Sequence, residues 1–156
     1  MIKLKKIFTS LALLLFCSSC GYTPIFSKKD VNFSIIKIEF LGDKDVEKKI
    51  SNALFSYKNK PGKQKKVALV ITNSKNISIA SKNSKGEALT NKIVVDANVK
   101  IILAENNFLE KSFNKSSIYT IINSKSEQKL IVDKLIANLS NEIASQIIFE
   151  ILKNTK

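Results

Sequence analysis

The sequence contains no histidine and no arginine, and only two of its 156 residues are cysteines. Without an imidazole, the chain cannot build a Ser-His-Asp triad or a zinc site with histidine ligands. Without a guanidinium group, it has no side chain that grips a phosphate with two parallel hydrogen bonds, because lysine acts as a single mobile charge. These absences remove most catalytic machinery.

The acidic residues point in the same direction. The 13 Asp and Glu residues are dispersed along the chain, and no segment resembles a glycine-rich phosphate loop or a nucleophile elbow. Pairs of carboxylates, or of serine with lysine, remain formally open. We therefore predict a protein that is not an enzyme and that has no metal site and no cofactor.

The N-terminal residues form a short basic and apolar leader. Three lysines are followed by an apolar run over residues 7–16 and by Ser18-Ser19, which lie directly before Cys20. This is the order of regions in a secretory signal, with small residues at the cut. The apolar run is too short to span a bilayer, which needs about 20 residues. The pattern is that of a bacterial lipoprotein, in which the cysteine after the cut is acylated.

On this interpretation residues 1–19 are a signal peptide, Cys20 carries acyl chains that hold the chain on a membrane, and residues 20–32 form a lipidated tether. Cys17 is then discarded with the leader, so the mature chain has neither a free thiol nor a disulfide. Gly21 follows the cut instead of the aspartate that retains lipoproteins in the inner membrane, which favours the outer membrane.

Two other interpretations of the leader stay open. Cleavage before Cys17 would place the bulky Phe16 at the cut, where a small residue is required. The other alternative is an ordinary secretory signal, or an N-terminal helix, in which Cys20 is incidental.

All 26 basic residues are lysines, and the net charge is +13, or +10 once the three leader lysines are removed. A field of this size attracts polyanions such as nucleic acid, anionic lipid heads or the phosphates of lipid A. An exported protein does not meet nucleic acid, so we expect none as a partner. The alternative is a solvated lysine surface that reflects biased coding.

The apolar pattern over residues 33–156 predicts a single domain with the order β-α-β-β-β-α. The expected strands are 33–41, 67–72 with a ragged extension to 79, 88–103 and 108–122, with turns at 82–86 and 105–107. The expected helices follow Asp43 and Ser124, which are predicted to cap them, Ser124 in a capping box with Glu127. In the first strand, Ile36, Ile38 and Phe40 are predicted to share the buried face. The fold class is therefore α+β, a two-layer sandwich whose four-stranded mixed sheet carries two helices on one face.

Two helices cannot cover both faces of a sheet. The second face is therefore either polar or in contact with another molecule. The candidates for apolar residues on that face are Ile93, Ile102, Phe108, Ile118 and Tyr119, although some of them fit the covered core equally well.

The segment after the predicted cut, Cys20-Gly21-Tyr22-Thr23-Pro24-Ile25-Phe26, resembles the opening of LPS-assembly lipoproteins of the LptE type. The expected element order is similar to that of this family. The stretch Ala88-Leu89-Thr90-Asn91-Lys92 resembles the family's small-x-Thr-Arg stretch before its longest strand.

The resemblance implies a non-catalytic plug and assembly partner of the LptD β-barrel in lipopolysaccharide transport. Such a protein is anchored in the outer membrane, faces the periplasm and is inserted in the barrel lumen. The resemblance also implies contacts with lipid A phosphates, for which Lys92 is the first candidate and Lys85 and Lys82 are the next. Because Asn91-Lys92 stands where the family carries arginine, we expect no bidentate clamp.

A different class of function is the alternative. A generic outer-membrane lipoprotein adaptor, either an accessory subunit of a lipid-transport system or a pilotin-like chaperone of a secretion channel, would share the leader, the size and the lack of catalytic residues. A third class, a lipid-modifying hydrolase, is disfavoured by the lack of histidine and of a free cysteine.

Overall fold

The computed structural model describes residues 31–104 and 107–155. The predicted signal peptide, Cys20 and the tether up to residue 30 lie outside the described residues, as does most of the predicted turn at 105–107. All described helices and strands belong to one compact unit, Asn32–Lys156. They are, in order, β1 (Phe33–Gly42), α2 (Lys44–Leu54), a 3-10 turn (Phe55–Tyr57), β2 (Lys65–Lys82), β3 (Ala88–Ala104), β4 (Asn107–Thr120) and α3 (Lys125–Asn154).

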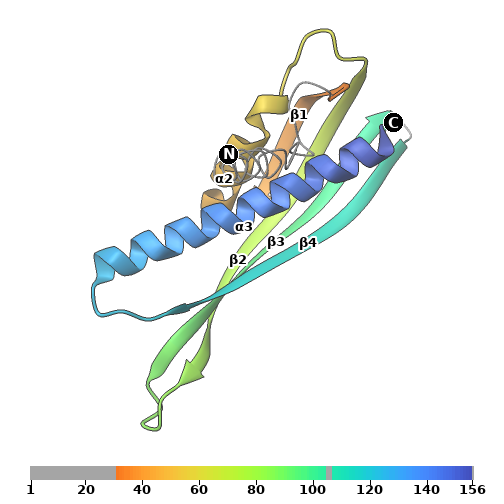
Figure 1. Cartoon of the computed structure of the whole chain (residues 1–156). Coiled ribbons are helices and arrows are strands. Elements are labelled where there is room, and N and C mark those ends of the chain that lie inside the picture. The colour runs from red at the N-terminus through yellow and green to blue at the C-terminus, as the bar shows by residue number, and fades with distance from the viewer. Residues whose placement is uncertain (1–30, 105–106, 156) are drawn as a thin grey trace, which may run out of the picture. The chain divides into compact units, whose positions relative to one another are not determined.

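The four strands form one mixed sheet in the order β1-β2-β3-β4. β1 pairs with β2 in parallel, and the other two pairs are antiparallel. Both helices lie on the same face of this sheet (Figure 1). The predicted α+β sandwich and its element order are thus confirmed.

The core lies between the helices and the sheet, and the sequence pattern located much of it correctly. Val46, Ile50 and Leu54 form the buried stripe of α2, as their helical spacing predicts. In α3 the buried stripe runs from Ile136 to Ile151 and includes two small residues, Ser140 and Ala144. The alternate β3 residues from Val95 to Ile101 are buried beneath the helices.

The prediction for the buried face of β1 was wrong at Ile36. Ile36 is 48% exposed, whereas Phe33 and Ile35 are fully buried. The pairing of β1 with β2 shifts register between Ile35 and Lys37, so Ile36 is the extra residue of a β-bulge. A bulge inserts one unpaired residue and thereby reverses the alternation of faces. After it, Ile38 and Phe40 do point toward the helices, opposite Leu69 and Ile71.

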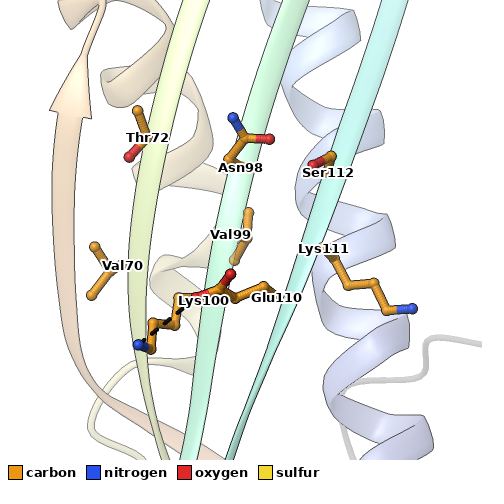
Figure 2. Close-up of a pocket in the computed structure, with 8 residues that line it drawn as sticks. All are labelled: Val70, Thr72, Asn98, Val99, Lys100, Glu110, Lys111 and Ser112. Atoms are coloured by element: carbon orange, nitrogen blue, oxygen red, sulfur yellow. Dashed lines mark ion pairs between the residues drawn. The ribbon is translucent and has the colours of Figure 1, made fainter.

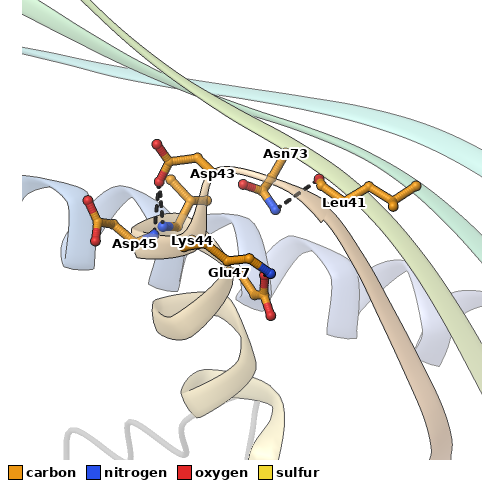
Figure 3. A network of polar contacts seen from close by, with 7 residues as sticks. Leu41, Asp43, Lys44, Asp45, Glu47 and Asn73 are labelled. Atoms are coloured by element: carbon orange, nitrogen blue, oxygen red, sulfur yellow. Dashed lines mark hydrogen bonds and ion pairs between the residues drawn. The ribbon is translucent and has the colours of Figure 1, made fainter.

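Both helices begin at the residues predicted to cap them. The side chain of Asp43 accepts hydrogen bonds from the backbone N–H groups of Asp45 and Val46, at 2.9 and 3.1 Å (Figure 3). Ser124 accepts one from the N–H of Glu127. Glu127 was expected to bond back to Ser124 in a capping box; in the structure it is the side chain of Gln128 that reaches back, and it accepts instead from the N–H of Ile122 at 2.8 Å.

The second strand is longer than predicted. β2 runs without interruption through 18 residues, and its pairing with β3 extends to Lys82 and Ala88. The end of this β2–β3 hairpin extends beyond both helices (Figure 1). From Asn76 onward every β2 residue is exposed, because no described helix covers that part of the strand.

Candidate functional site

The face of the sheet turned away from the helices is polar in its middle. Directly paired residues share a face, so the register gives three neighbouring rows across β2, β3 and β4. These rows are Thr72–Asn98–Ser112, Ser74–Asp96–Asn114 and Asn76–Val94–Ser116. Asp96 is their one charge, and it accepts a 2.6 Å hydrogen bond from Asn114 Nδ2. We call this surface, made of these nine residues, the open polar face.

Apolar residues lie at the two ends of the same face. Phe108 is 52% exposed and is paired with half-buried Ile102, while Ile118 at the opposite end is 62% exposed. The other two candidates from the sequence, Ile93 and Tyr119, are buried on the helix side. The open face is therefore polar over its centre, with separate apolar residues at its margins.

A shallow depression of about 340 Å³ lies on this face. Figure 2 shows Thr72, Asn98 and Ser112 from three strands along one side of it, with Lys100 and Glu110 below them. Lys100 Nζ lies 3.8 Å from a carboxylate oxygen of Glu110 and 3.8 Å from the centroid of the Phe108 ring. Since Lys100 already has these partners, Thr72, Asn98 and Ser112 offer uncharged hydrogen-bonding groups to a ligand or a partner, and exposed Lys111, which also lines the depression, adds a positive charge.

The candidate phosphate-binding lysines all lie toward the end of the β2–β3 hairpin. Lys82 is the last residue of β2, Lys85 lies in the turn, and Lys92 sits on the open face between Ser78 and Ile118. Lys82 had been predicted in the turn, but pairing with Ala88 extends β2 to include it. All three side chains are exposed, and none forms an ion pair among the described residues.

Asn83 organises the turn that carries these lysines. Its side-chain oxygen accepts hydrogen bonds from the N–H groups of Lys85 and Glu87, each at 2.9 Å, and its amide nitrogen donates to Glu87 Oε2 at 2.7 Å. An asparagine that bonds to the following backbone in this way fixes a tight turn. The turn is therefore built by Asn83, and the ammonium groups of Lys82 and Lys85 are left to solvent or to a ligand.

A second polar cluster joins β2 to the start of α2. Lys75 Nζ lies 2.7 Å from Asp45 Oδ2 and 3.3 Å from Asp43 Oδ2. The hydrogen bond from Lys75 holds the pKa of Asp45 below its ordinary value of 3.8. Partial burial acts to lower the pKa of Lys75, but its hydrogen bonds to Asp45 and Asp43 outweigh that effect and keep it above 10.5. This cluster, one lysine between two aspartates, ties the start of α2 to β2.

Two kinds of feature are missing from the part of the chain that the structure describes. Within residues 31–104 and 107–155, no three His, Cys, Asp or Glu side chains come together to hold a metal ion. Neither of the two described helices combines the length and the apolar character needed to cross a bilayer.

A polar second face was one of the two alternatives that the sequence left open, but the nine residues of the open polar face were not identified from it. In β3, Asp96 and Asn98 alternate with the apolar Val95, Ala97 and Val99, which is a signal of one exposed face. The corresponding segments of β2 and β4 show no such alternation, because polar residues also occupy the positions between. The alignment of these residues into rows depends, however, on the register between strands. The residue pattern of a single strand does not reveal that register.

Solved structures of bacterial lipoproteins share this fold. Rare lipoprotein B from Shewanella oneidensis superposes with a TM-score of 0.55 at 10% identity, covering 77% of this chain and 99% of that one. An uncharacterized lipoprotein B from Nitrosomonas europaea gives a TM-score of 0.56 at 12% identity, with coverages of 80% and 88%. A minor lipoprotein from Acinetobacter baumannii gives 0.50 at 15% identity, with coverages of 74% and 92%. At these identities the likeness establishes a shared fold.

The sequence comparisons give no match. No protein-family model matches the chain, and no curated protein does.

Proposed function

We propose that this chain is an outer-membrane lipoprotein that acts, without catalysis, as plug and assembly partner of an LptD-type β-barrel in lipopolysaccharide transport. The observation that carries the proposal is the open polar face, a broad sheet surface whose centre has one charge, on Asp96, already hydrogen-bonded to Asn114. A partner that covers such a surface has to be polar as well, and the interior of a large outer-membrane barrel is polar.

The fold supports the same proposal. The opening motif at Cys20 resembles LptE-type lipoproteins, and the structural likeness to rare lipoprotein B supports an LptE-like fold. A domain of this fold whose N-terminal cysteine is acylated would be held at the membrane in which the barrel lies.

The lysines at the hairpin end supply the ligand contacts in this proposal. Lys82, Lys85 and Lys92 are exposed, and each is available to a phosphate of lipid A as a mobile point charge. Their grouping near one end of the hairpin would let one phosphorylated lipid meet more than one ammonium group.

The partner is tested by purification from membranes in mild detergent. We expect the native chain to bring down a very large β-barrel protein, and a photo-cross-linking residue at Ser112 to link to it. Asn98→Lys, which places a charge in the open polar face, should lower the recovery of the barrel. Asn141→Lys, an equal change on the exposed side of α3, is the control and should leave the recovery unchanged. Recovery of an ABC transporter or a secretin instead would favour the adaptor alternative.

The ligand is tested separately. Replacing Lys82, Lys85 and Lys92 together by glutamine should weaken lipopolysaccharide binding. The same replacement of Lys48, Lys134 and Lys153, which are exposed on the helices, keeps the total charge equal and should have a smaller effect. Equal losses in the two triple variants would show that only net charge matters. Unchanged surface lipopolysaccharide after depletion of the protein would contradict the assembly role.

A further inference from the structure

The end of the β2–β3 hairpin carries large apolar side chains in solvent. Ile77 is 42% exposed, Ile79 54%, Leu89 47% and Ile121, just after β4, 36%. Ile77, Ile79 and Leu89 belong to the outer part of the β2–β3 hairpin, and Ile121 lies in the loop between β4 and α3. We call these four residues the distal apolar strip.

The register places Ile77 and Ile79 on the helix side of the sheet. Ile77 pairs with Ile93, and Ile79 pairs with Asn91, which in turn pairs with Tyr119. Ile93 and Tyr119 are buried on the helix side, so their row neighbours Ile77 and Ile79 point the same way.

Leu89 and Ile121 complete the strip. Ile121 lies two residues after Tyr119, just beyond the end of β4, and Leu89 is the extra residue of β3 where its pairing with β2 shifts register between Ser81 and Lys82. The N–H of Ile121 donates a 2.9 Å hydrogen bond to the carbonyl of Leu89, which holds the two residues side by side. Ile77 and Ile79 therefore continue the core layer of the domain past the point where helices cover it, and Leu89 and Ile121 add exposed apolar side chains at the same end of the sheet.

Positive charge borders the strip. Segments 76–92 and 121–130 together contain five lysines and two glutamates. Lys82 and Lys85 lie at the outer end of the hairpin, and Lys125 lies at the start of α3, next to the loop that carries Ile121. Among the described residues none of these three lysines forms an ion pair.

We infer that the distal apolar strip docks on the surface of an anionic phospholipid bilayer. In this arrangement the isoleucine and leucine side chains enter the headgroup and acyl boundary, and the bordering lysines meet the lipid phosphates with their aliphatic stems lying along the apolar layer. The inference goes beyond the proposed function and does not depend on it.

The composition of the strip favours lipid over a protein partner. The cores of protein interfaces are enriched in aromatic residues, methionine and arginine, and they are depleted in lysine. The strip has aliphatic residues only and a lysine border, which is the combination that binds anionic membrane surfaces.

The chain itself provides a clean probe, because it contains no tryptophan. The full chain carrying Ile79→Trp is mixed with vesicles of phosphatidylcholine, with and without phosphatidylglycerol, that include brominated lipid as a quencher. Tryptophan fluorescence reports the depth of the hairpin itself, so an acyl anchor elsewhere on the chain does not contribute to the signal. Ile118→Trp is the matched control, because it lies at the same end of the sheet on the opposite face and is 62% exposed.

We expect the emission of Ile79→Trp to shift to the blue and to be quenched when phosphatidylglycerol is present, while that of Ile118→Trp changes little. Adding Lys82→Gln and Lys85→Gln should weaken docking about thirtyfold, because each lysine near an anionic leaflet contributes about fivefold. A Leu89→Trp variant repeats the test if Ile79→Trp fails to fold.

Three outcomes would overturn the inference. In the first, Ile79→Trp stays equally accessible to a water-soluble quencher with and without vesicles. In the second, a blue shift grows with protein concentration in the absence of lipid, which would assign the strip to a second copy of the chain. In the third, quenching occurs with lipopolysaccharide aggregates and not with phospholipid vesicles, which would assign the strip to the proposed ligand.

Discussion

Gly42 at the end of β1 lies directly against the backbone of Asn73 in β2, with no room between them for a side chain. A Cβ atom at position 42 would overlap the carbonyl oxygen of Asn73 and lie 2.9 Å from its carbonyl carbon. Gly42 also has φ +120°, which side-chain-bearing residues rarely adopt. Asn73 is itself buried, and its side-chain amide donates to the carbonyl of Leu41 at 3.3 Å (Figure 3). This contact fixes where β1 stops and α2 begins.

Gly42→Ala should therefore destabilise the fold by about 3 kcal/mol, because strain at φ and overlap with Asn73 act together. Urea unfolding monitored by circular dichroism measures the change. Gly86→Ala is the matched control, since Gly86 has φ +83° but open space around it, and only the conformational cost of about 1 kcal/mol applies. Equal losses in the two variants would show that the contact with Asn73 has no separate effect.

The ion pairs of Lys75 predict how stability depends on pH. The pKa of Asp45 is lowered in the folded state, so its contribution is present above the unfolded pKa of about 4 and is lost as the pH falls through the folded pKa. The pKa of Lys75 is raised, so its contribution is present below about pH 10.4 and is lost as the pH rises through the folded pKa.

We expect Lys75→Met to reduce the loss of stability between pH 7 and pH 3, because Asp45 then titrates near its unfolded pKa. The measurement is the free energy of unfolding in urea at both pH values for the native chain and the variant. Carboxylates that do not contact Lys75 contribute equally to both proteins and cancel, whereas Asp43, 3.3 Å from Lys75, also loses its ion pair in the variant. If the free energy of unfolding falls by the same amount between pH 7 and pH 3 in the variant as in the native chain, the assigned role of Lys75 is contradicted.

Ser140→Ala should make the protein more stable. The Ser140 side chain is fully buried in α3, and its hydroxyl has no hydrogen-bond partner among the described residues. The substitution removes an unsatisfied hydroxyl and introduces alanine, which has a higher helix propensity. Together these effects are expected to raise the free energy of unfolding by about 1 kcal/mol. A higher urea midpoint with an unchanged denaturant slope would confirm this, and a lower midpoint would mean that the hydroxyl has a partner in solution.

Ile143→Ala should remove a large part of the stability. Ile143 is fully buried at the centre of the α3 stripe, and truncation of such a residue costs about 3 kcal/mol. Phe149→Ala removes more atoms from the same helix but acts on a side chain that is 52% exposed, so we expect a change within about 0.5 kcal/mol. Thermal unfolding of both variants distinguishes the two sides of the helix, and comparable losses would contradict the assigned burial.

Side chains whose position depends on nearby residues were placed correctly from the sequence, whereas those whose position depends on distant strands were not. Asp43 and Ser124 were identified as caps because capping depends on the next two or three residues. The side of the sheet occupied by Ile93 and Tyr119 was left open, because it depends on pairing with distant strands. The roles of Cys20 as anchor and of Lys82, Lys85 and Lys92 as phosphate contacts stay predictions.

The sequence by itself determines the order of the elements, the starts of both helices and the apolar stripes of α2 and α3. Turns, caps and periodicity depend on only a few neighbouring residues, so they can be predicted without the fold. The tertiary structure decided the bulge at Ile36, the full length of β2, the rows of the open polar face and the distal apolar strip. Each of these is set by register, which relates residues far apart in the chain, and a shift of one residue moves every side chain of a strand to the other face.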